Sequence, residues 1–121
     1  MNFMLTKRLL RKLGPIQHPN ERDRKRIERG LISRKHYRYV SPSVTLVKVG
    51  YLIESCHRSR TIDYDGGQID VAIFHYDVVS GVWKVFFKDH ARGSWKIYGI
   101  FYRLASAINE LNTDPERLFW Q

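Results

Sequence analysis

Three β-rich runs between residues 69 and 98 constrain the fold of this chain more than any other feature. The runs are IDVAIFHY (69–76), VWKVFFK (82–88) and WKIY (95–98), and short turn segments separate them. The middle run sets Trp83, Val85 and Phe87 on one side of a strand, opposite Lys84, Phe86 and Lys88. Because connections this short join antiparallel neighbours, the pattern predicts an antiparallel meander.

The flanking segments extend this sheet and then cover it. YRYV (37–40), VTLVKV (44–49) and YLIESC (51–56) are β-rich runs interrupted at Pro42 and Gly50, so we expect four to six strands in all. A helical period follows, which predicts a helix over residues 99–112 on one face of the sheet. A last turn starts at Pro115, and Leu118, Phe119 and Trp120 should dock on the body. The core is expected to contain Trp83, Trp95, Trp120, Phe87, Phe101 and Phe119.

The N-terminal third predicts two basic helices. Residues 3–13 place leucines on one side and cations on the other, and residues 20–35 begin with a capping signal, Asn20, followed by Asp23. Gly30 is a point where the second helix is expected to end or bend. The expected fold class is therefore α+β, with N-terminal basic helices, an antiparallel meander and a C-terminal helix packed on one face. Residues 1–20 form a basic amphipathic helix and linker, and residues 21–121 a single α+β domain.

The net charge belongs to one part of the chain. The whole sequence carries +9, from 21 Lys and Arg against 12 acids. Residues 1–40 hold twelve of the cations and three of the acids, and residues 41–121 hold nine of each. Such an asymmetry attracts polyanions at long range.

This asymmetry favours a non-enzymatic nucleic-acid or polyanion binding module without sequence-specific base recognition, since no DNA- or RNA-reading motif accompanies it. Cations neutralise phosphates, and tyrosines stack on unpaired bases. Whether the ligand is DNA, RNA or an acidic protein stays open, and no cofactor or metal is expected. The expected binding residues are Lys7, Arg8, Arg11, Lys12, Arg22, Arg24, Lys25, Arg26, Arg29, Arg34, Lys35, Tyr37, Arg38 and Tyr39.

Three alternatives remain at this point. The leucine side of residues 3–13 could form a homodimer or bind an acidic protein. Asp70 and Lys88 resemble part of a metal-dependent nuclease site, but Phe86 stands where those enzymes usually carry an acid. The loop between residues 56 and 70 could bind an anion through Arg58, Arg60, Gly66 and Gly67.

Length and composition exclude several other classes. The chain has 121 residues, of which 43% are hydrophobic, enough for one core. No apolar run approaches the roughly 18 residues of a membrane-spanning helix. The single cysteine, Cys56, excludes an internal disulfide and suggests a reducing compartment. A cytoplasmic location is expected.

Four segments of the sequence resemble one bacterial family. They are SRTIDYDGGQIDVAIF (59–74), VWKVFFKDHARGSWKIY (82–98), the terminal DPERLFWQ (114–121) and ERDRKRIERGLISRKHYRYVSP (21–42). Together they resemble the domain of unknown function numbered 3024, over about four-fifths of the chain. The resemblance implies a small single-domain bacterial protein, and it implies no activity and no catalytic residues.

Overall fold

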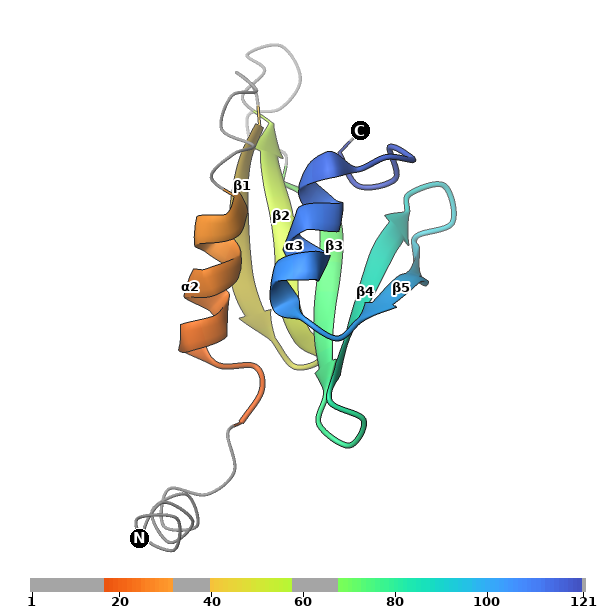
Figure 1. Cartoon of the computed structure of the whole chain (residues 1–121). Coiled ribbons are helices and arrows are strands. Elements are labelled where there is room, and N and C mark those ends of the chain that lie inside the picture. The colour runs from red at the N-terminus through yellow and green to blue at the C-terminus, as the bar shows by residue number, and fades with distance from the viewer. Residues whose placement is uncertain (1–16, 32–39, 58–67, 121) are drawn as a thin grey trace, which may run out of the picture.

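A computed structural model describes residues 17–31, 40–57 and 68–120 of the chain (Figure 1). Its five strands form one sheet in the order β1-β2-β3-β4-β5, and every neighbouring pair is antiparallel. The α+β class and the meander expected from the sequence are therefore confirmed. The elements are α2 (Glu21–Gly30), β1 (Val40–Val47), β2 (Gly50–His57), β3 (Gln68–Asp77), β4 (Val82–Asp89), β5 (Ser94–Phe101) and α3 (Leu104–Thr113).

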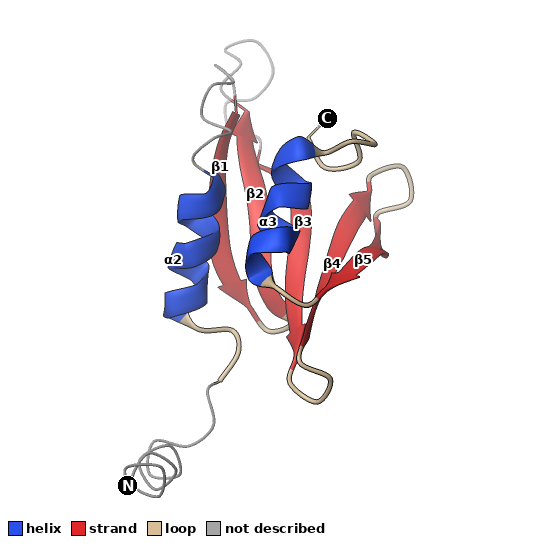
Figure 2. Cartoon of the chain, viewed as in Figure 1, coloured by secondary structure: helices blue, strands red, loops and turns tan. Residues whose placement is uncertain are grey.

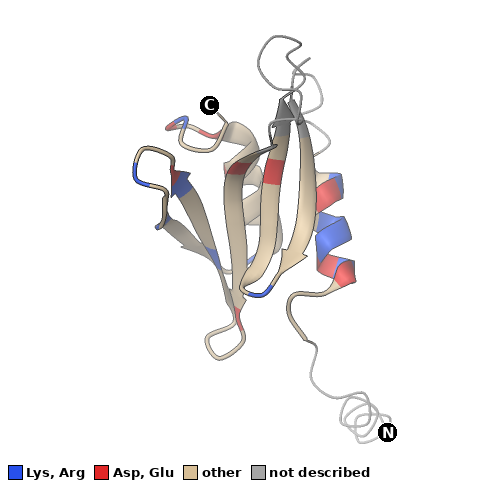
Figure 3. Ribbon diagram, turned by 180° about the vertical axis from the view of Figure 1, so that it is seen from behind, with Lys and Arg blue, Asp and Glu red and all other residues tan. Residues whose placement is uncertain are grey.

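Both helices pack on the same face of the sheet (Figure 2). Helix α2 lies against β1, and α3 lies over β4 and β5 and also contacts α2. Their buried side chains meet those of the central strands in one core, where each large apolar group contributes about 1.5–3 kcal/mol. Its members include Ile27, Leu31, Tyr51, Ile53, Phe74, Trp83, Val85, Leu104, Ala107, Leu111 and Phe119. On the opposite face, which Figure 3 shows from behind, no described segment covers the strands.

Two bulges turn extra side chains toward the helices. The registers Ile53↔Ala72 and Glu54↔Asp70 leave Val71 as an extra residue of β3, and both Val71 and Ala72 are buried. In β5 the extra residue is Tyr98, between the pairs Val85↔Gly99 and Phe86↔Ile97. Its ring packs on Phe119, and its hydroxyl donates to Glu110 Oε1 of α3 at 2.7 Å. The second bulge thereby ties the edge strand to the helix.

Some element boundaries differ from the sequence-based expectation. Strand β5 continues to Phe101, because Ile100 and Phe101 pair with Lys84 and Trp83, so α3 begins at Leu104 rather than at residue 99. Pro42 does not interrupt β1, because β1 is an edge strand and has a free side where the missing N–H costs nothing. Helix α2 ends at Gly30, as expected, and residues 32–35 of the predicted helix lie outside the described residues.

The C-terminal tail docks on the body through Asp114. This buried carboxylate accepts the backbone N–H groups of Leu118, Phe119 and Trp120 at 2.9, 3.3 and 3.0 Å. The Trp120 indole donates to Leu111 O at 2.7 Å, and the Phe119 ring is in the core. The expected docking is confirmed. Trp95 is an exception to the expected core, because it lies beside Lys88 on the open face, with Lys88 Nζ 4.9 Å from its ring centroid. None of the described helices is long and apolar enough to cross a membrane.

Candidate functional site

Helix α2 carries the described part of the expected nucleic-acid interface. The Asn20 side chain accepts the Asp23 N–H at 2.8 Å, and Glu21 and Asp23 complement the positive helix start. The helix presents Arg22, Arg24, Lys25, Arg26 and Arg29. The other expected contacts, Lys7, Arg8, Arg11, Lys12, Arg34, Lys35, Tyr37, Arg38 and Tyr39, lie outside the described residues, and so do Arg58, Arg60, Gly66 and Gly67 of the expected anion loop.

Two of the five cations are engaged within the helix. Arg24 bonds Glu21 through Nε and reaches Glu28 through Nη1 at 2.7 Å, and these two hydrogen bonds raise the pKa of its guanidinium. Arg26 Nη1 lies 2.9 Å from Asp23 Oδ1. Both arginines therefore stabilise α2 and its cap. The count of charges in the sequence assigned them to ligand binding, because it could not identify their ion pairs within the helix.

The other three cations form what we call the α2 row: Arg22, Lys25 and Arg29. They are three and four positions apart, which sets them within about 60° of one another around the helix axis. The row lies opposite the side that buries Asp23 and Ile27, and all three side chains are exposed. Within the described part of the chain, no ion pair involves any of them. Figure 3 shows the charged outer side of α2 beside the sheet.

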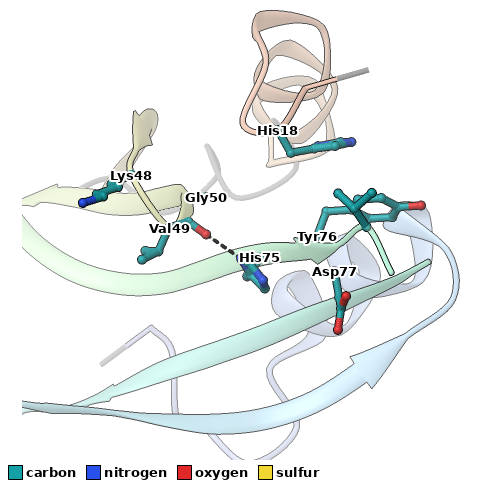
Figure 4. Close-up of a pocket in the computed structure, with 8 residues that line it drawn as sticks. His18, Lys48, Val49, Gly50, His75, Tyr76 and Asp77 are labelled. Atoms are coloured by element: carbon teal, nitrogen blue, oxygen red, sulfur yellow. Dashed lines mark hydrogen bonds between the residues drawn. The ribbon is translucent and has the colours of Figure 1, made fainter. Parts of the chain in front are cut away.

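A pocket of about 220 Å³ opens where the β1–β2 turn meets the end of β3 (Figure 4). It was not expected from the sequence, because its two histidines are 57 positions apart and no motif links them. The residues that line it are His18, Lys48, Val49, Gly50, His75, Tyr76, Asp77 and Val78.

His18 joins the start of α2 to the sheet. Its Nδ1 lies 2.9 Å from the Tyr51 hydroxyl, which also accepts the Asn20 N–H at 3.0 Å. The imidazole ring packs on Tyr76 at 4.4 Å between centroids and edge-on to Trp83. Burial lowers the pKa of His18, Asp23 at 3.6 Å opposes this effect, and nearby His75 adds to it.

His75 and Asp77 are held by their own local contacts. His75 Nδ1 donates to Val49 O at 2.7 Å. The Asp77 carboxylate accepts the N–H groups of Val79 and Ser80, and Lys84 Nζ lies 3.3 Å from it. These contacts, with hydrogen bonds from Ser80 foremost, lower the pKa of Asp77. In this pocket His75 and Asp77 are therefore hydrogen-bonded to neighbouring backbone groups, and Lys48 is exposed.

Asp70 and Lys88, the pair that suggested a nuclease, do come together. Lys88 Nζ lies 3.5 Å from Asp70 Oδ2, and Glu54 is the cross-strand neighbour of Asp70. The Lys88 ammonium is therefore paired with the Asp70 carboxylate, which a catalytic metal ion would need as a ligand. Among the described residues, no group of three or more His, Cys, Asp or Glu side chains is arranged to hold a metal ion.

Comparisons with known proteins agree with the resemblance seen in the sequence. The sequence model of a family described as Domain of unknown function (DUF3024) matches residues 15–121. No curated protein and no solved structure matches the chain. The matched range takes in His18, α2, all five strands and the Asp114-anchored tail. The chain therefore belongs to the DUF3024 family.

Proposed function

We propose that this protein is a non-enzymatic nucleic-acid binding module that holds the phosphate backbone with its basic N-terminal third. The observation that carries the proposal is the α2 row. Arg22, Lys25 and Arg29 are exposed and have no acidic partner within the described residues, although Glu21, Asp23 and Glu28 lie on the same helix. Those acids pair with Arg24 and Arg26, so the row keeps its charge for an external anion.

The spacing of the row suits a backbone contact. Successive row members are separated by about 4.5 Å and about 6 Å along the helix axis, since each residue advances about 1.5 Å. Three cations on one line can each neutralise a phosphate and release a counterion. Phosphate contacts carry no sequence information, so we propose binding with little sequence preference.

The charge distribution along the chain supports the N-terminal third as the place where the ligand binds. Residues 41–121 have nine cations and nine acids, so the remainder of the molecule neither attracts nor repels a polyanion as a whole. The positive electrostatic potential of the chain therefore arises in the N-terminal third. This potential raises the rate at which an anionic partner encounters that part of the molecule. The single cysteine of the chain is compatible with a reducing compartment, and we propose the bacterial cytoplasm as its location.

Fluorescence anisotropy with labelled single- and double-stranded DNA and RNA tests the proposal, at several salt concentrations and with the full chain. The variant replaces Arg22, Lys25 and Arg29 with Gln. The matched control replaces Arg92, Arg103 and Arg117 with Gln, which removes the same charge from exposed positions outside α2. Arg24 and Arg26 are left intact because their ion pairs support the helix.

We expect the row variant to weaken binding and to reduce the slope of log K against log salt by about 2 to 3, from about 0.7–0.9 per lost phosphate contact. The control should change the slope much less. Equal losses in both variants would show that net charge alone acts, and absence of binding by the wild type would refute the proposal. A gel of the same mixtures with and without Mg²⁺ tests the nuclease alternative, which predicts cleavage that disappears in Asp70→Ala.

A further inference from the structure

We propose that two copies of this chain pair face to face through the open side of the sheet. This inference goes beyond nucleic-acid binding and does not depend on it. The open face is the side of the strands that looks away from α2 and α3, and no described segment lies against it (Figure 3).

The open face has an apolar row that a solvated sheet face does not need. The registers align Leu52, Ile73, Phe86 and Ile97 across β2 to β5. Ile100 lies further along β5, and Ile97 and Ile100 are 53% and 56% exposed. An antiparallel sheet with one wet face usually alternates polar residues outward, so an apolar line across four strands marks an interaction surface.

Among the described residues the charges of this face nearly cancel, so the face does not favour a polyanion as its occupant. Lys84 pairs with Asp77 and Lys88 with Asp70, at 3.3 and 3.5 Å. Glu54 then leaves a small negative excess near one end. The surplus of +9 on the whole chain opposes association of two copies at most other surfaces, and a neutral apolar face is where that repulsion is weakest.

The remaining polar groups make the face complementary to itself. Glu54 and the Asp70–Lys88 pair lie toward one end of the strands, while the opposite end, at the β1–β2 turn, has Lys48 and the Asp77–Lys84 pair. A twofold axis in the plane of the sheet and across the strands lays the acidic end of one copy over the basic end of its partner. Such a contact is isologous, the commonest kind in homodimers.

The area is sufficient for a stable pair. Five strands about 4.8 Å apart and eight residues long, at about 3.3 Å per residue, project about 600 Å². The side chains that project from the sheet add further area, so the face approaches the standard interface size of about 800 Å² per partner. Packed in this way, the two sheets leave both α2 rows on the outside of the dimer, since α2 lies on the other face.

Sedimentation velocity of the full chain tests the pairing, from about 1 to about 100 µM, which brackets a Kd of micromolar order. We expect a dimer at the upper end. Replacing Ile97 and Ile100 together with Lys should leave a monomer throughout this range. The matched control replaces Val78 and Val79 with Lys in the β3–β4 turn, where they are 64% and 96% exposed, and it should dimerise like the wild type. Circular dichroism verifies folding, and Ile97→Thr with Ile100→Thr, which keeps β-branching, replaces the lysine pair if that variant does not fold.

A charge variant separates specific pairing from general adhesion. Glu54→Lys makes both ends of the face basic and should raise the dimer Kd about tenfold, whereas Glu116→Lys, the same change on the exposed C-terminal segment, should not. A wild type that is monomeric at every concentration would overturn the proposal. So would a dimer that survives both Ile97/Ile100 variants, or one that dissociates with Leu5→Glu and Leu9→Glu while the lysine pair leaves it intact.

Discussion

Gly30 of α2 and Ile108 of α3 are in direct contact, and no side chain fits between them. A Cβ built on Gly30 would lie 2.5 Å from Ile108 Cγ2. The Gly30 carbonyl also accepts a hydrogen bond from the Asn112 amide at 2.8 Å. The two helices therefore meet at the residue where α2 ends, and this contact accounts for a glycine that is unfavourable by helix propensity alone.

Gly30→Ala should destabilise the protein although alanine favours a helix. The added methyl overpacks the helix contact, which typically costs about 1–3 kcal/mol and exceeds the propensity gain of about 1 kcal/mol. Urea denaturation measures the effect. In an Ile108→Ala background the same substitution should be neutral or stabilising, because the colliding methyl is gone. An equal loss in both backgrounds would contradict the assigned contact.

Asp114→Ala should release the C-terminal tail. Three backbone N–H groups would lose their acceptor, and we expect a loss of about 2–4 kcal/mol, since each buried unsatisfied group costs about 1–3 kcal/mol and part of the tail would become hydrated. Hydrogen exchange at Leu118, Phe119 and Trp120 should accelerate. Asp114→Asn keeps one carbonyl acceptor and tolerates the left-handed backbone, with φ 42°, so it should cost less. Unchanged exchange in the alanine variant would disprove the anchoring role.

His18 should make folding stability fall in mild acid. Its pKa is lower in the folded than in the unfolded protein, so the unfolded state binds more protons once the pH drops below about 6.5. The stability is fully present above that pH and is lost as the pH falls toward the folded-state pKa. We expect the urea midpoint to decrease between pH 7 and pH 5. His18→Gln, which keeps a polar partner for Tyr51 without titrating, should show a smaller decrease, and an identical pH profile would contradict the prediction.

Two hydrogen-bonded tyrosines, buried Tyr51 and half-buried Tyr98, should ionise late. Burial raises the pKa of Tyr51 to about 12, and the hydrogen bond to Glu110 raises that of Tyr98 to about 12. Because both values exceed the unfolded value of about 10, this stability is present below pH 10 and is lost as the pH rises toward 12. Absorbance titration should show two phenols ionising after the others, and one in Tyr98→Phe. A single transition near pH 10 in the folded protein would refute the late ionisation of Tyr51 and Tyr98.

The local features were predictable because they depend on neighbours in the sequence. Alternation around Trp83, Val85 and Phe87 predicted a strand with a buried face, and Asn20 followed by Asp23 predicted the helix start. The periodicity at Leu104, Ala107 and Leu111 predicted the covering helix, but it was extended too far upstream. Ile100 and Phe101 fit either period, and their pairing with β4 decided for the strand.

By itself, the amino-acid sequence determined the fold class, the meander, the family and the confinement of net charge to the first forty residues. Each of these follows from residue types and short spacings. Only the tertiary structure decided which α2 cations form ion pairs. The length of a side chain and its position on the helix determine whether it reaches an acid, as Arg24 reaches Glu28, or extends into solvent. It also brought His18 to Tyr51 and Gly30 to Ile108, across 33 and 78 positions in the chain. Long-range packing sets these contacts, and no local pattern encodes them.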